Sequence, residues 1–201
     1  MRFHYRLGWL CTLAFARLIW GFRRRGIESI PKGGPVIIAS NHISNWDPIL
    51  VGLGCRREVH FWAKEELFHN PWLAFLIRAY NAIPVRRGKA DRKALRDASE
   101  VLARGGVLVM FPGGTRDESG EVKDPKPGVG FIACANNAPV VPAYITGSNR
   151  LARATRRACR LMVAFGEPIA PREARSGEEY RAFASQVAGA IGRLRQEVEG
   201  L

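Results

Sequence analysis

Residues 36–48 read VIIASNHISNWDP, and this stretch holds the turn around which the rest of the chain is organised. Val36–Ala39 is a short apolar run rich in β-branched residues, which is typical of a buried strand. The run stops before Asn41 and His42, and Asp47 follows directly before a proline. On a continuous helix, two residues five positions apart point about 140° away from each other. The pattern therefore predicts a strand, a bend that can bring His42 and Asp47 together, and then a helix.

The rest of the chain alternates in the same way between apolar strand candidates and helical patterns. The strand candidates are residues 36–39, 59–62, 82–85, 107–111, 140–145 and 161–165. The helix candidates are residues 48–54, 72–80, 91–104 and 128–137, and a last helix follows the capping-box pattern of Ser176 and Glu179. This alternation predicts an α/β fold, with a mostly parallel or mixed central sheet flanked by helices. Sites in such sheets lie beyond the carboxyl ends of strands, which is where His42 stands.

The chain is unusually basic. Among 201 residues, 31 Lys and Arg stand against 18 Asp and Glu, which gives a formal net charge of +13. Such an excess predicts a polyanionic partner: nucleic acid, an anionic membrane or a phosphate-bearing substrate. No nucleic-acid-binding motif is evident, so no nucleic-acid partner is expected. One arginine stripe recurs at helical spacing and is expected to be a solvated face, the alternatives being contact with phosphates or lipid head groups: Arg150, Arg153, Arg157 and Arg160.

Residues 3–22 read FHYRLGWLCTLAFARLIWGF and are followed by Arg23–Arg25. The longest uncharged run, Leu7–Ala16, is far shorter than the roughly 20 apolar residues that cross a bilayer. Aromatic and leucine residues flanked by arginines predict an amphipathic helix that lies in the membrane interface. Two alternatives are a helix packed on the domain's own core and a signal peptide, although no small-x-small cleavage site follows. Four side chains are expected to insert into the membrane: Trp9, Leu13, Phe15 and Trp20.

This reading divides the chain into a membrane-associating segment, residues 1–25, and one domain, residues 26–201. The four cysteines form no CxxC pair and no disulfide-like spacing, which is typical of a cytosol-facing protein. We therefore expect monotopic or peripheral association with the cytoplasmic face of a membrane.

His42 and Asp47 suit general-base chemistry. A carboxylate bonded to one ring nitrogen fixes the tautomer and raises the basicity of the other nitrogen. The alternatives are a helix-capping Asp47 and a loop histidine without a catalytic role. No G-x-S-x-G elbow exists, and neither Ser40 nor Ser44 has the setting of a nucleophile, so the activated hydroxyl is expected to belong to a substrate. No histidine has metal-ligand spacing, and no metal is expected.

Cationic and hydrogen-bonding groups follow the other predicted strands. The set comprises Lys64, Arg86, Arg87, the loop Pro112–Gly114 with its free backbone amides, Thr115 and Arg116. Charge-assisted hydrogen bonds from such groups suit a phosphate. Individually, each is more often a solvated residue or part of a simple turn. Their shared placement after strands, on the side of His42, favours a phosphate-binding site.

Four ordered segments resemble the blocks of the lysophosphatidate (1-acylglycerol-3-phosphate) acyltransferase family. They are Asn41-His42-x4-Asp47, Ile83-Pro84-Val85-Arg86-Arg87, Phe111-Pro112-Gly113-Gly114-Thr115-Arg116 and Val140-Val141-Pro142. The segments 63–68 and 126–128 also look like parts of the family, and the likeness spans about residues 30–170. The resemblance implies that His42 is the base for the acceptor hydroxyl, that Asp47 supports it, and that Arg87 and Arg116 bind phosphate.

The likeness has one departure. The family's third block usually has Glu where this chain has Gly113, and that Glu is associated with acceptor binding. Gly113 can open space for another head group, or Asp117 or Glu118 can substitute for the missing carboxylate. Asn41, Lys64, Gly113, Gly114 and Thr115 complete the predicted substrate-binding set.

The predicted function is transfer of a fatty acyl group from acyl-CoA or acyl carrier protein to the sn-2 hydroxyl of 1-acylglycerol-3-phosphate, which forms phosphatidic acid. The expected partners are a lysophospholipid acceptor, an acyl thioester donor and an anionic membrane surface. No cofactor and no covalent acyl-enzyme are implied. The alternatives are the acylation of another lysolipid, such as a lyso-amino-acid lipid, and a non-catalytic basic module.

Overall fold

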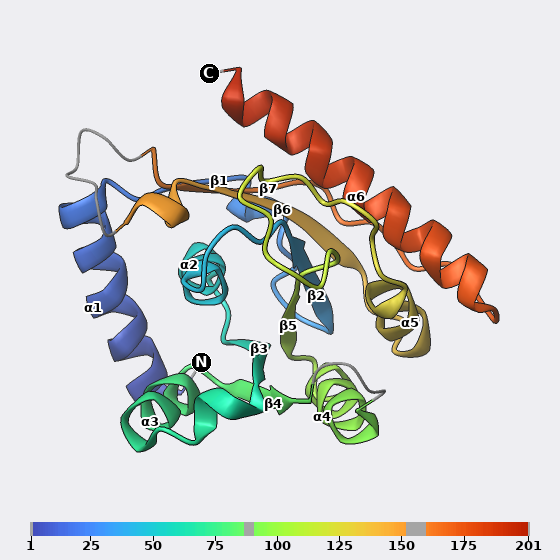
Figure 1. The fold of residues 1–201 in the computed structure, drawn as a ribbon, viewed down its shortest axis with the longest axis horizontal. Coiled ribbons are helices and arrows are strands. Elements are labelled where there is room, and N and C mark those ends of the chain that lie inside the picture. Colours follow the sequence, from blue (N-terminus) through green and yellow to red (C-terminus); the bar gives the residue numbers. More distant parts are fainter. Residues whose placement is uncertain (1, 87–90, 152–159, 201) are drawn as a thin grey trace.

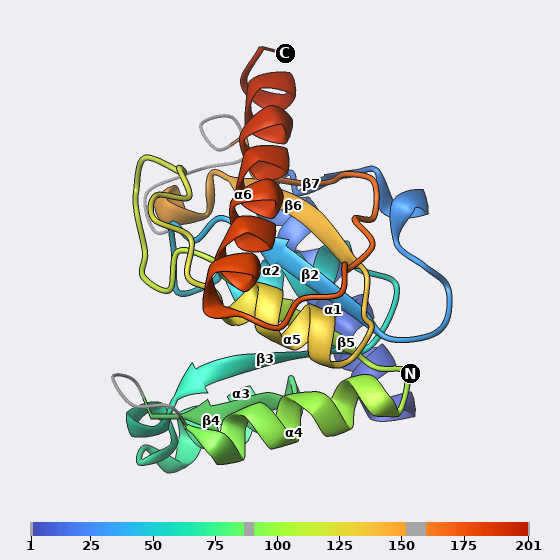
Figure 2. The ribbon, with the colours of Figure 1, turned by 90° about the vertical axis from the view of Figure 1, so that its right-hand side faces the viewer.

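The computed structural model describes residues 2–86, 91–151 and 160–200 as a seven-stranded mixed sheet with helices on both faces (Figures 1 and 2). The strand order is β1-β7-β6-β2-β5-β3-β4, and every neighbouring pair is parallel except β6 and β7. The strands are β1 (Arg23–Arg25), β2 (Val36–Ser40), β3 (Val59–Lys64), β4 (Ala82–Val85), β5 (Val107–Met110), β6 (Val140–Thr146) and β7 (Met162–Phe165). The helices are α1 (Phe3–Trp20), α2 (Asp47–Gly54), α3 (Pro71–Ala79), α4 (Arg92–Ala103), α5 (Gly128–Ala135) and α6 (Gly177–Glu199), with 3-10 turns η1 (Ile27–Ser29), η2 (Glu65–Phe68) and η3 (Ser148–Arg150). The predicted fold class is confirmed.

Each strand and helix that the sequence predicts is present, with its ends within two residues of the predicted ones. The capping box at Ser176 and Glu179 is also present. The sequence does not predict β1, whose three arginines pair in parallel with Met162–Ala164 at one edge of the sheet. A charged edge strand discourages further strand pairing, which is the usual use of such residues at an edge.

The two faces of the sheet have separate cores. Helices α1, α2 and α3 cover one face, and α4, α5 and α6 cover the other (Figure 1). Side chains of a strand alternate between faces, so Val36 and Ile38 of β2 pack into the first core and Ile37 and Ala39 into the second. Strand β2 is therefore buried on both sides, which makes its carboxyl end a rigid support for the turn that follows.

Helix α1 packs one of its faces on the domain and exposes the other. Leu13 is buried in the first core, and Trp9 and Trp20 pack against that core, so the expected insertion of Leu13 into a membrane is wrong. Trp9 Nε1 also donates to the carbonyl of Gly52. Of the four side chains expected to insert, Phe15 points outward, with 52% of its surface exposed. The alternative prediction, a helix that packs on the domain's own core, is therefore correct for one face of α1.

The division into a membrane-associating segment, residues 1–25, and a domain, residues 26–201, stays a prediction. In the structure, β1 is an edge strand of the domain's sheet, and side chains of α1 belong to its first core. None of the helices in the described ranges is long and apolar enough to cross a bilayer. Of the predicted arginine stripe, Arg153 and Arg157 lie outside the described residues.

Arg57 ties together the loops that lead into β2 and β5. Its guanidinium donates to the carbonyls of Pro31 at 2.8 Å, Gly34 at 2.6 Å and Gly105 at 2.6 Å. Partial burial lowers the pKa of this group, yet the three acceptors hold it in place. Strands β2 and β5 carry His42 and Phe111 just beyond their other ends, so this anchor fixes the spacing of the two strands that frame the site.

We expect Arg57→Met to lower the free energy of unfolding by about 3 kcal/mol, because several partly buried carbonyls lose their donor at once. Urea denaturation followed by circular dichroism measures the change. The matched control is Arg56→Met, since Arg56 is the exposed neighbour of Arg57. An equal decrease in the free energy of unfolding for the two variants would show that the three hydrogen bonds of Arg57 do not stabilise the fold.

Candidate active site

The bend after β2 brings His42 and Asp47 into direct contact. His42 Nδ1 lies 2.8 Å from Asp47 Oδ2, and 11% of the His42 side chain and none of the Asp47 side chain is exposed. The dyad stands beyond the carboxyl end of β2, a central strand of the sheet. The sequence prediction that these two residues meet is therefore confirmed, and their catalytic role stays a prediction.

Asp47 does not act as the cap of α2. Its Oδ2 atom accepts hydrogen bonds from the backbone amides of Ile43, at 2.6 Å, and Ser44, at 2.7 Å, which precede it in the bend. The N-cap position of α2 is Trp46, whose side chain makes no capping bond. The alternative reading of Asp47 as a simple helix cap is therefore wrong. The carboxylate closes the bend and holds the ring of His42.

These contacts define the state of His42. The Ser148 hydroxyl donates to Asp47 Oδ1, so donors surround both carboxylate oxygens, and an oxygen set that only accepts belongs to an ionised carboxylate. Nδ1 of His42 is then the donor to Asp47, which in the neutral imidazole leaves the lone pair on Nε2. Nε2 is the atom that can take a proton from a substrate hydroxyl.

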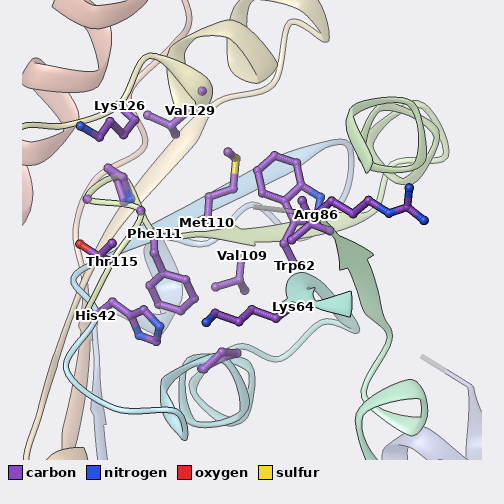
Figure 3. A pocket seen from close by; sticks show the side chains of 16 residues that line it. His42, Trp62, Lys64, Arg86, Val109, Met110, Phe111, Thr115, Lys126 and Val129 are labelled. Carbon is purple, nitrogen blue, oxygen red and sulfur yellow. The ribbon is translucent and has the colours of Figure 1, made fainter. Parts of the chain in front are cut away.

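Two further contacts fix the imidazole ring. It stacks on Phe111, which follows β5, with the ring centroids 4.1 Å apart and an angle of 22° between the planes (Figure 3). The backbone amide of Asp117 donates to the carbonyl of His42 at 2.8 Å. The orientation of His42 thus depends on residues after two neighbouring strands as well as on its own bend.

A first cavity of about 550 Å³ opens beside His42. Figure 3 shows the Lys64 ammonium pointing toward His42 and Phe111, whereas the guanidinium of Arg86 points away. Arg86 is bonded to Glu65 outside the cavity, at 2.6 and 3.1 Å. Among the residues that the structure describes, no Asp or Glu lines this cavity and Lys64 has no carboxylate partner. The lining comprises His42, Pro48, Trp62, Lys64, Val85, Arg86, Val109–Thr115, Lys126, Gly128 and Val129.

A second cavity of about 410 Å³ is, like the first, lined mostly by apolar surface and also by cationic side chains. It is lined by His42, Asn45, Trp46, Pro48, Ile49, Trp62, Ala63, Lys64, Leu67, Leu73, Leu76, Ile77 and Arg116. The two cavities share His42, Pro48, Trp62 and Lys64, so the imidazole lies where they meet. Trp46, Leu67 and Leu76 are between 40% and 51% exposed, which places the lining of the second cavity partly at the protein surface.

The structure brings most, but not all, of the predicted substrate-binding residues to these cavities. Gly113 and Thr115 line the first cavity and Arg116 lines the second, whereas Arg87 lies outside the described residues. Gly114 also lines the first cavity, but its amide donates to the carbonyl of Phe111 at 2.9 Å, so the expectation that this amide is free is wrong. These substrate-binding roles stay predictions.

Asn41 is buried and takes part in the structure of the strand ends. Its Nδ2 atom donates to the carbonyl of Ile145 at 2.9 Å, and its Oδ1 atom accepts from the amide of Ile145 at 2.8 Å. Asn41 lines neither cavity. Its predicted contact with a substrate stays a prediction, and the structure shows that its side chain joins the end of β2 to β6.

Asp117 and Glu118 do not take the place of the carboxylate that Gly113 lacks. Hydrogen bonds from Ser119 and Lys123 lower the pKa of Asp117 to about 2, so this carboxylate is already engaged at the surface. Neither residue lines the first or the second cavity. A Cβ atom built on Gly113 would meet the backbone oxygen of Thr115 at 3.7 Å, an ordinary contact, so a side chain could start there without a clash.

The described residues hold no rival chemistry near the dyad. Burial raises the pKa of the Cys55 thiol to about 11, which makes it a poor nucleophile, and Cys55 lines neither cavity. No group of three His, Cys, Asp or Glu in the described ranges could hold a metal ion. The expected absence of a cofactor stays a prediction.

Sequence reasoning missed Ser148, which contacts Asp47 from 101 positions further along the chain. The available signal was weak: Ser148 is a polar residue shortly after the end of a predicted strand. Its proximity to the dyad follows only from the order of the strands, because β6 pairs with β2.

The comparisons with known proteins agree with this geometry. Residues 21–146 match the Acyltransferase family. A 1-acyl-sn-glycerol-3-phosphate acyltransferase of Bacillus subtilis is 31% identical over 144 residues, which cover 71% of this chain and 70% of that protein. A lyso-ornithine lipid O-acyltransferase of Rhizobium meliloti is 30% identical over 139 residues, which cover 68% of this chain and 47% of that protein.

A solved structure is also similar. The crystal structure of a 1-acyl-sn-glycerophosphate acyltransferase from Thermotoga maritima superposes with a TM-score of 0.70 and 30% sequence identity. The match covers 96% of this chain and 78% of that one. The resemblance that the four sequence blocks indicate is confirmed.

Proposed function

Because the chain belongs to the Acyltransferase family and is an acyltransferase, we propose that it acylates the sn-2 hydroxyl of 1-acylglycerol-3-phosphate and forms phosphatidic acid. The observation that carries the proposal is the position of His42. Held by Asp47, it lies where two cavities meet, and each of them combines cationic side chains with a mostly apolar lining. Such a junction suits a reaction between a charged acceptor and a fatty acyl chain.

The proposed mechanism is a direct transfer. Nε2 of His42 removes the proton of the acceptor hydroxyl while the oxygen of that hydroxyl attacks the carbonyl carbon of the acyl thioester. The tetrahedral intermediate then expels the thiolate, which takes the proton from the imidazolium. Asp47 stabilises that imidazolium through Nδ1 and keeps the ring in place. The protein needs no nucleophile of its own, and the donor is acyl-CoA or acyl carrier protein.

The electrostatics of the first cavity favour a phosphorylated acceptor. Lys64 points its ammonium into the cavity near His42, and no carboxylate among the described lining residues opposes it (Figure 3). An ornithine head group carries an ammonium beside its carboxylate, and this lining complements the carboxylate but not the ammonium. The second candidate is nevertheless a lyso-amino-acid lipid, because Gly113 has no side chain where the family has Glu.

A panel of acceptors tests the proposal. The purified protein is incubated with labelled acyl-CoA or acyl carrier protein and with 1-acylglycerol-3-phosphate, lyso-ornithine lipid or monoacylglycerol, and the product is identified. We expect phosphatidic acid as the main product. Preferential acylation of the lyso-ornithine lipid would establish the second candidate, and no product from any acceptor would refute both.

We expect Lys64→Ala to lower kcat/KM for 1-acylglycerol-3-phosphate about tenfold or more, because a charge-assisted hydrogen bond contributes about 1.5–3 kcal/mol. The value for monoacylglycerol, which has no phosphate, should change much less. Steady-state kinetics with both acceptors measure the difference. The control is Lys93→Ala, because Lys93 pairs with Asp97 on α4 and lines neither cavity. Equal losses on the two acceptors would contradict a phosphate contact.

The proposal includes a membrane surface. Large exposed hydrophobic side chains form an apolar face on α1, η2 and α3: Phe3, Leu7, Leu10, Phe15, Leu18, Ile19, Leu67, Trp72, Phe75 and Leu76. Thr12 of α1 is hydrogen-bonded to Tyr80 next to α3, and both helices cover the same face of the sheet (Figure 1). Leu67 and Leu76 also line the second cavity. We infer peripheral association, on the cytoplasmic side, through this apolar face.

A further inference from the structure

Ser148 is a buried polar residue that contacts the dyad from another strand. Its side chain lies just beyond β6, only 1% of the residue is exposed, and its Oγ atom donates to Asp47 Oδ1 at 2.5 Å. It lines neither cavity, so it has no path to a substrate in this structure. Any effect of Ser148 on the reaction must pass through Asp47.

The two oxygens of Asp47 have different sets of donors. Oδ2 accepts from Nδ1 of His42 and from two backbone amides of the bend. Oδ1 accepts from Ser148, and this is its sole hydrogen bond to the described part of the chain. Because Asp47 is fully buried, water cannot replace the hydroxyl without a rearrangement. Ser148 therefore fixes the rotation of the carboxylate about its Cβ–Cγ bond from the Oδ1 side, together with the three donors to Oδ2.

The backbone around Ser148 is built for this placement. Gly147 has a φ of +81°, and a Cβ atom there would come within 2.9 Å of the backbone oxygen of Arg160, so the tight turn after β6 requires glycine. The side chain of Asn41 holds the end of β2 against Ile145 of β6 through two hydrogen bonds. These features align the ends of β2 and β6 and keep the Ser148 hydroxyl within hydrogen-bond distance of Asp47.

We propose that Ser148 is a positioning residue for acyl transfer, which orients the Asp47 carboxylate so that Oδ2 faces His42 Nδ1. The proposal rests on the proposed function, in which His42 is the base. Without the hydroxyl, Oδ1 has no partner in a buried site, and only the three donors to Oδ2 hold the carboxylate against the rotation that would give Oδ1 a donor. The imidazole then loses its fixed orientation toward the acceptor hydroxyl, although both substrates still bind.

The test is the kinetics of Ser148 variants, expressed per folded molecule after near-UV circular dichroism and thermal melting. Ser148→Ala is expected to lower kcat about tenfold, which corresponds to about 1.4 kcal/mol, with KM for acceptor and donor nearly unchanged. Ser148→Thr keeps the hydroxyl and should restore most of kcat. Ser148→Cys keeps the shape with a weaker donor and should lie between the two.

Two controls separate positioning from a purely structural role. Ser99→Ala removes another serine hydroxyl, which accepts a hydrogen bond from Asn136 and lines neither cavity, and should leave kcat nearly unchanged. In an Asp47→Asn background, Ser148→Ala should have little further effect, because residues that act as a unit are not additive. Equal kcat for Ser148→Ala and the unaltered protein, or a full additional loss in the Asp47→Asn background, would overturn the proposal.

His42→Ala is measured beside these variants, so that the two failures can be told apart. If His42→Ala keeps full activity, the proposed base is wrong and the role of Ser148 fails with it. If His42→Ala is inactive and Ser148→Ala keeps its kcat, the proposed function stands and only the positioning role is lost.

Discussion

Replacing His42 with alanine is expected to lower the rate of acyl transfer by at least about 100-fold, the contribution that general-base catalysis commonly makes. The loss should fall on kcat, because in the proposed mechanism the ring acts on the reacting hydroxyl, whereas other residues form most of both cavities. Folding should survive, because His42 stands in a bend beyond β2 and not among the core side chains. Steady-state kinetics with a labelled acyl thioester, alongside thermal melting, measure both effects.

The companion variant is Asp47→Asn. An amide cannot accept hydrogen bonds from every donor around the Asp47 carboxylate, so we expect a loss of kcat of about 100-fold and a lower melting temperature. The rate must therefore be expressed per folded molecule. Full activity in the folded fraction of Asp47→Asn would show that Asp47 only closes the bend. Full activity of His42→Ala would remove the proposed base.

The second large effect concerns the apolar face. Trp72 and Phe75 on α3 are 86% and 75% exposed, and we expect Trp72→Ser with Phe75→Ser to weaken partition onto anionic vesicles about 100-fold. Burial of two large side chains contributes about 3 kcal/mol at the low end of the usual range, which is about 100-fold in partition. Vesicle co-sedimentation across a salt series measures it. The loss should persist at high salt, because salt screens charges and not apolar contacts.

The matched control for this experiment is Phe131→Ser. Phe131 is 38% exposed on α5, which covers the opposite face of the sheet (Figure 1). Its replacement should leave vesicle partition unchanged. Equal partition of the unaltered protein and the double variant, with both folded, would show that α3 does not contact the membrane. Removal of residues 1–25 is a poorer test, because that deletion also removes core side chains of α1 and the strand β1.

The sequence determined the elements that depend on short stretches of chain. Val36–Ala39 and the other apolar runs form strands because their residue types and spacing favour a buried extended chain, and the structure places each of them in the sheet. The contact of His42 with Asp47 was also predictable, because a bend of a few residues connects them. The four blocks in order indicated the acyltransferase family, and the comparisons confirm it.

Only the tertiary structure decided the features that join distant parts of the chain. Three arginines carry no strand pattern, and Arg23–Arg25 become β1 because β7, about 140 residues later, offers them an edge to pair with. The burial of Leu13 and the exposure of Phe15 depend on which face of α1 meets the sheet, and a helix rich in apolar residues on both faces does not reveal this. Ser148 reaches Asp47 because β6 lies beside β2. Strand order and helix facing result from packing between segments far apart in the sequence, so the local pattern around each residue could not predict them.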